Sequence, residues 1–87
     1  MLWGMWQVNS EVLVTELDGE LVLMHPARSE MFSLNASGRL IWRALPQTQA
    51  ALGELLAARY GLSLEQAGAD VSAVLQALSE RDLARSV

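Results

Sequence analysis

The stretch Phe32–Trp42, FSLNASGRLIW, predicts a strand that ends at an asparagine and continues at once as a helix. Asn35 is a good N-cap, because its side-chain oxygen can accept a hydrogen bond from a free backbone N–H in the first helical turn. We expect the helix to run from Ala36 to Leu45, where Pro46 ends it. Its apolar residues recur at the spacing of one helical face: Ala36, Leu40, Ile41, Ala44 and Leu45.

The residues before this junction predict three antiparallel strands. Two runs rich in branched apolar residues, Val12–Leu17 and Glu20–His25, are separated by Asp18-Gly19, a dipeptide that suits a two-residue type I′ turn. Pro26 lacks a backbone N–H and ends the second strand. A third strand follows over Glu30–Leu34, so the three strands form a meander.

The third strand is expected to have an apolar face and a free edge. Because side chains alternate along a strand, Phe32 and Leu34 should meet the core, and Met31 and Ser33 should point away from it. A strand that passes directly into a capped helix leaves no loop to cover its free side. Its unpaired N–H and C=O groups can then accept another extended chain.

Two more helices are predicted after Pro46. Thr48 can cap the first of them and Gly61 can end it, and its apolar face is Leu52, Leu55, Leu56 and Tyr60. Ser63-Leu64-Glu65-Gln66 fits a capping box for a helix over Leu64–Glu80. The apolar stripe of that helix is Leu64, Ala67, Val71, Val74, Leu75 and Leu78. The predicted fold is α+β and winged helix-turn-helix-like, with a three-stranded antiparallel sheet followed by three helices.

Length and composition favour one small domain. The chain has 87 residues, and although 52% of them are hydrophobic, no apolar run approaches the roughly 20 residues of a membrane helix. The start, MLWGMWQV, lacks the charged region and cleavage site of a signal peptide, so we expect a soluble, cytoplasmic protein that does not bind membranes. Trp3 and Trp6 leave three alternatives open: an added strand, a self-association surface or a disordered tail.

Charge and residue types disfavour two function classes. Ten Asp and Glu face six Arg, with no lysine, and the helix expected over Leu64–Glu80 carries no basic residue, so a winged-helix DNA-binding protein is disfavoured. A small enzyme is disfavoured because we find no catalytic set of nucleophile, histidine and carboxylate, no phosphate loop and no metal-ligand cluster. We expect no cofactor and no metal. His25, next to a turn, is interpreted as a surface histidine.

The junction resembles a motif of the PqqD family, small domains that recognise ribosomally made, modified peptides. LNASGRLIW at Leu34–Trp42 is similar to the family's Leu-Asn-x-x-(Gly/Ala)-x-x-(Ile/Val)-(Trp/Leu) pattern. The similarity extends to His25-Pro26, to Leu56–Leu62 and to DVSAVLQAL at Asp70–Leu78, whereas the ending RDLARSV fits only in part. The resemblance assigns residues 11–87 to a PqqD-like recognition domain and residues 1–10 to an N-terminal segment, either strand or tail.

The resemblance implies binding without chemistry. In this family the leader part of a precursor peptide adds as a fourth strand to the third strand and lies between that strand and the third helix. The implied peptide-binding residues are Glu30, Met31, Phe32, Ser33, Leu34, Asp70, Ala73, Val74, Ala77, Leu78 and Arg81, of which Asp70 and Arg81 would orient a charge of the leader.

The same resemblance leaves the pathway and the assembly open. The implied partners are the leader and a leader peptidase or other maturation enzyme. A short free-standing chain favours lasso peptide biosynthesis over pyrroloquinoline quinone biosynthesis. The oligomeric state is left open.

Overall fold

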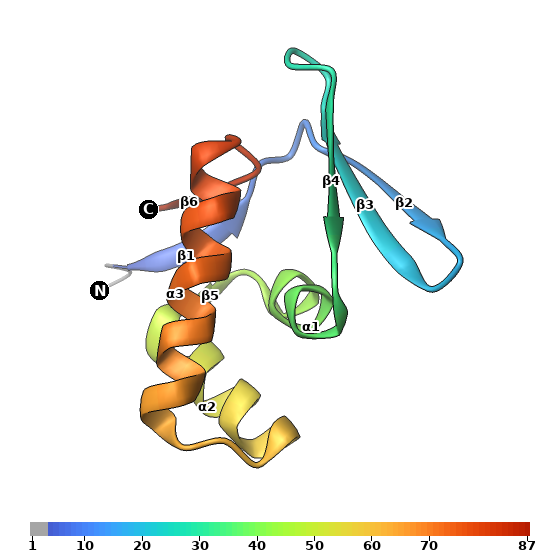
Figure 1. Cartoon of the computed structure of the whole chain (residues 1–87). Coiled ribbons are helices and arrows are strands. Elements are labelled where there is room, and N and C mark those ends of the chain that lie inside the picture. Colours follow the sequence, from blue (N-terminus) through green and yellow to red (C-terminus); the bar gives the residue numbers. More distant parts are fainter. Residues whose placement is uncertain (1–3) are drawn as a thin grey trace.

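The computed structural model describes residues 4–87, and its central feature is the predicted antiparallel meander (Figure 1). The strand order is β2-β3-β4. The turn between β2 and β3 has positive φ at both Asp18 (51°) and Gly19 (79°), as a type I′ turn requires. The bounds are β2 Leu13–Leu17, β3 Glu20–His25 and β4 Glu30–Leu34. This confirms the predicted meander, with β2 starting one residue later than expected.

Three helices follow, and the predicted caps are confirmed. Asn35 accepts a hydrogen bond from the Gly38 N–H, Thr48 caps the second helix, and Ser63 forms the capping box with Gln66. The C-cap of the second helix has left-handed φ of 65°, a conformation that glycine adopts easily. The bounds are α1 Ala36–Ala44, α2 Gln49–Tyr60 and α3 Leu64–Glu80.

A second sheet was not predicted as a unit. Its order is β5-β1-β6, so the central strand lies near the start of the chain and one neighbour lies near its end. Trp6, on the central strand, packs against the core, whereas Trp3 lies outside the described residues. The bounds are β1 Met5–Val8, β5 Gln47–Thr48 and β6 Ala84–Ser86. For Trp6, the strand alternative is therefore the one that the structure shows.

The core lies between the meander and the helices. Its fully buried side chains include Leu23 from β3, Ile41 from α1 and Leu75 from α3. Three residues expected on apolar faces are instead exposed, namely Leu55 (37%), Tyr60 (44%) and Leu64 (66%). Leu64 and Tyr60 stand at helix ends.

The interpretation of His25 as a surface residue is wrong. Only 6% of its surface is exposed, because it lies on the same face of β3 as Leu21 and Leu23, two buried core residues. The β3 face that fills the core therefore ends in a histidine.

Gly38 makes the abrupt junction between β4 and α1 possible. A Cβ atom added there would lie 3.0 Å from Cδ2 and 3.3 Å from Cβ of Leu34, and 3.3 Å from Oδ1 of Asn35. Leu34 is buried and has little room to move, and Asn35 is needed as the cap. The spacing Leu-Asn-x-x-Gly thus has a physical reason: the helix turns back tightly over the residue that ends the strand.

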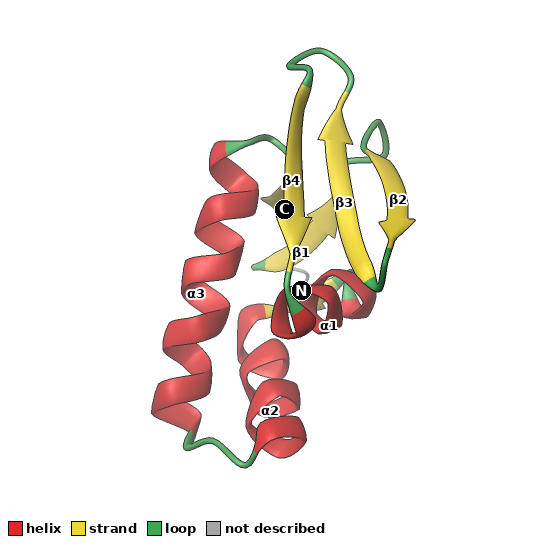
Figure 2. Cartoon of the chain, turned by 45° about the vertical axis from the view of Figure 1, so that its right-hand side comes forward, coloured by secondary structure: helices red, strands yellow, loops and turns green. Residues whose placement is uncertain are grey.

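β4 is an edge strand that faces α3. It pairs with β3 on one side, and Figure 2 shows α3 beyond its other side with α1 below. In an antiparallel pair, alternate residues of an edge strand leave their N–H and C=O groups without a strand partner. The meander therefore presents unpaired backbone groups toward a helix.

Candidate functional site

A hollow of about 260 Å³ lies between β4 and α3. We name it the β4–α3 groove and define it by its lining residues: Phe32, Ser33, Leu34, Asn35, Gly38, Ala73, Val74 and Ala77. The strand side contributes an aromatic ring, and the helix side contributes small or branched apolar side chains. No charged residue lines it. Such a groove can receive apolar side chains of an extended chain that pairs with the strand edge.

Arg81 closes one end of the groove. Its guanidinium lies 4.4 Å from the centroid of the Phe32 ring, which is cation–π distance. Its Nη1 also donates to the carbonyl oxygen of Ala77 one turn earlier, at 3.3 Å. Arg81 therefore bridges the two walls.

A second hollow, of about 350 Å³, continues past the N-terminus of α1. It shares Asn35 with the groove and is otherwise lined by Ala36, Ser37, Leu56, Tyr60, Leu62 and Asp70. Because its lining adds a carboxylate and a phenol, this end of the surface differs chemically from the apolar groove.

The structure brings six of the predicted peptide-binding residues together in the groove: Phe32, Ser33, Leu34, Ala73, Val74 and Ala77. Asp70 lines the second hollow, Arg81 stands at the opposite end, and Glu30 begins β4, where it pairs with His25. Contact between these residues and a peptide stays a prediction. Sequence reasoning missed Asn35 and Gly38 as lining residues, since both were assigned only to the junction.

Met31 and Leu78, two of the predicted peptide-binding residues, do not line the groove. Met31 is 68% exposed and is not among the lining residues, although Ser33, on the same face of β4, is one of them. Leu78 is fully buried, because its position on α3 turns it into the core rather than toward β4. It can support the groove from below, but its side chain has no exposed surface to offer.

Residues 4–87 contain no group of three or more His, Cys, Asp or Glu side chains placed to hold a metal ion. Over the same residues, none of the helices combines the length and the apolar character needed to cross a bilayer. What the site offers is a strand edge beside an apolar groove.

The comparison with protein families decides the relationship. Residues 20–84, more than half of the chain, match the model for "Coenzyme PQQ synthesis protein D (PqqD)". The chain belongs to the PqqD family. The matched residues include β3, β4 and all three helices, and hence every residue that lines the groove of this PqqD-family chain. No curated protein matches it in sequence.

Two solved structures share the fold of this PqqD-family chain. "Lasso peptide synthetase B1 complexed with the leader peptide" has a TM-score of 0.82 and 24% identity, over 92% of this chain and 96% of the other. "TbiB1 in Complex with the TbiA(beta) Leader Peptide" has a TM-score of 0.82 and 25% identity, over 91% of this chain and 94% of the other. The likeness thus extends over nearly the whole of each chain.

Proposed function

We propose that the chain binds the leader region of a ribosomally synthesised precursor peptide and delivers it to a leader peptidase or modifying enzyme. The leader adds as a fourth strand to β4 and lies in the β4–α3 groove. The observation that carries this proposal is the open β4 edge beside an apolar groove, in a fold shared with two proteins whose structures contain leader peptides.

The chemistry of the groove suggests how such a leader is read. Hydrogen bonds to the β4 backbone supply affinity that depends little on sequence, and apolar side chains entering the groove supply the preference. Since the lining carries no charge, we expect uncharged leader residues opposite Phe32 and Ala73. Charged leader residues fit better at the two ends, near Asp70 or Arg81.

Lasso peptide biosynthesis is the pathway that the structural likeness favours, since one of the two similar structures is a lasso peptide synthetase B1 and both contain a leader peptide. The description of the family model favours a second candidate, synthesis of the coenzyme pyrroloquinoline quinone. In both, the chain acts as a binding protein and leaves the chemistry to its partner. We place this work in the cytoplasm, where ribosomes release the precursor.

We predict that the protein binds a leader peptide with a Kd of about 1 μM or below and shows no binding to duplex DNA at physiological salt. The apolar groove beside an open strand edge is the reason to expect peptide binding. The reason to expect no DNA binding is that the chain is acidic and its α3 carries no Lys or Arg. Fluorescence anisotropy measures both, using the labelled leader of a lasso precursor from the genome that encodes the chain and a labelled 20-base-pair duplex.

A scrambled leader of the same composition is the control for sequence preference. Tight binding of the duplex, with none of the leader, would overturn the proposal. Binding instead to the precursor of pyrroloquinoline quinone would favour the second candidate.

A further inference from the structure

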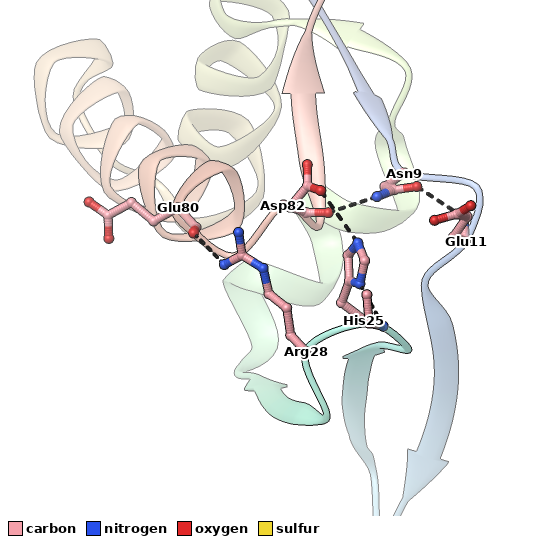
Figure 3. A network of polar contacts seen from close by, with 7 residues as sticks. Asn9, Glu11, His25, Arg28, Glu80 and Asp82 are labelled. Carbon is pink, nitrogen blue, oxygen red and sulfur yellow. Dashed lines mark hydrogen bonds and ion pairs between the residues drawn. The ribbon is translucent and has the colours of Figure 1, made fainter.

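The turn after β3 is fastened to the end of α3 by a buried histidine. The Nδ1 atom of His25 accepts a hydrogen bond from the Ala27 N–H at 3.1 Å, so the neutral ring carries its proton on Nε2. That atom lies 3.4 Å from Oδ2 of Asp82, in the turn after α3 (Figure 3). The ring therefore joins two segments that are far apart in sequence.

A second contact fastens the same two segments. Nη1 of Arg28 donates to the carbonyl oxygen of Glu80, the last residue of α3, at 3.0 Å. The free carbonyls at a helix C-terminus carry partial negative charge, so a cation is favourable there. Figure 3 shows Arg28 reaching from the β3–β4 turn to this helix end, beside His25.

Asp82 is itself held in place. Its backbone has a φ of 57°, in the left-handed region that residues other than Gly, Asn and Asp rarely adopt. Its carbonyl oxygen accepts a hydrogen bond from Nδ2 of Asn9 at 2.9 Å, and the Asn9 N–H donates to Leu83 at 2.9 Å. The backbone of Asp82 is therefore held from the side of the second sheet.

These contacts lie at one end of the β4–α3 groove. β4 begins at Glu30, two residues after Arg28, and α3 ends at Glu80. At its other end β4 passes through Asn35 directly into α1. The strand edge is thus anchored by the chain itself at one end and by side-chain contacts at the other.

Burying the polar ring of His25 costs free energy unless its nitrogens have polar partners in the fold. Position 25 continues a β3 face of buried leucines, where an apolar side chain would fill the space without any loss of hydration. The polar ring instead makes directional contacts, because its two nitrogens face the Ala27 N–H and the Asp82 carboxylate.

We propose that His25, Arg28 and Asp82 form a clamp that sets the distance between β4 and the end of α3, and thereby the affinity for the leader. The proposal rests on the proposed function. A groove that is already held at the width needed for binding loses little conformational entropy when a peptide enters. When the clamp is released, only part of the population holds that width, and the apparent affinity falls by that fraction. The three are positioning residues rather than contacts of the peptide.

Asp82→Gly combined with Arg28→Ala releases the clamp, and glycine keeps the left-handed backbone without strain. Asp82→Asn with Arg28 unchanged is the conservative rescue, because asparagine retains an acceptor and tolerates positive φ. Arg59→Ala, an exposed arginine of α2, is the control for the loss of one positive charge. Leader binding is measured well below each thermal midpoint, so that all variants are folded.

The separation between the meander and α3 is measured in the same variants. Because the chain has no cysteine, Thr15→Cys and Ser72→Cys place spin labels on exposed positions of β2 and α3 without further changes. Pulsed electron paramagnetic resonance then gives the distribution of distances between sheet and helix. We expect the double variant to bind about tenfold more weakly with a broader distribution, and Asp82→Asn and Arg59→Ala to stay within about twofold of wild type.

Two failures are distinguishable. If wild-type protein binds the leader and the double variant keeps both the affinity and the distribution, the clamp is overturned and the proposed function stands. If wild-type protein does not bind the leader, the proposed function falls, and an unchanged distribution in the double variant would overturn the clamp as well.

Discussion

Ala73→Trp is expected to weaken leader binding by a factor of roughly 30 or more, because loss of a buried anchor typically costs about 2 kcal/mol. Ala73 is exposed on α3 and lines the β4–α3 groove. An indole there fills space that a leader side chain needs. Since the position is exposed in the free protein, the fold should tolerate the change. Titration of labelled leader gives the affinity, and circular dichroism gives the thermal midpoint.

Ala58→Trp is the matched control. Ala58 is exposed on α2 and lies outside the lining of the groove, so the same change should leave the affinity unchanged. Equal loss in both variants would indicate a nonspecific effect. Unchanged binding in Ala73→Trp would show that the leader lies elsewhere.

The second large effect concerns the helix that forms one wall of the groove. Leu75→Ala is expected to lower the free energy of unfolding by about 2–5 kcal/mol, because it leaves a cavity in the core. Only 1% of Leu75 is exposed. A domain of this size has roughly 5–15 kcal/mol of stability, so the loss should be a large part of the total. Urea unfolding followed by tryptophan fluorescence measures it.

Leu64→Ala is the control on the same helix. Leu64 is 66% exposed, and the same truncation should cost within about 0.5 kcal/mol. Similar losses for both leucines would mean that α3 presents a different face to the core. The groove, which depends on that orientation, would then be placed wrongly.

The elements with local signals could be predicted from the sequence. Asp18-Gly19 supplies both positive φ values of the hairpin turn, and Asn35 and Ser63 supply side-chain acceptors at helix starts. Each of these devices acts within a few residues. Local sequence signals are therefore enough to predict the order of the meander strands and the helices.

Contacts between distant residues carried no such signal. β1 pairs with β5 and β6, whose two and three residues are too short to show a period. The position of His25 next to a turn predicts a surface residue, and Asp82, the carboxylate that meets its ring, comes near it only in the fold. Likewise Arg28 and Glu80, which meet across the turn, are 52 positions apart.

The candidate site could be predicted in part. Alternation along β4 does not by itself select the lining residues, because Phe32 and Ser33 lie on opposite faces of the strand and both line the groove. On α3, a periodic stripe does not tell which apolar residues face the core and which face the strand. Val74 and Ala77 line the groove, whereas Leu78, adjacent in sequence to Ala77, is fully buried.

Amide hydrogen exchange of Glu30–Leu34, followed by nuclear magnetic resonance, tests strand addition to β4 most directly. In the free protein, amides of this edge strand should alternate between slow exchange, where they pair with β3, and fast exchange, where they face the groove. With saturating leader, the fast amides should become slow, because the added strand accepts their hydrogen bonds. If the leader is bound and these amides still exchange as fast as in the free protein, the leader does not pair with β4.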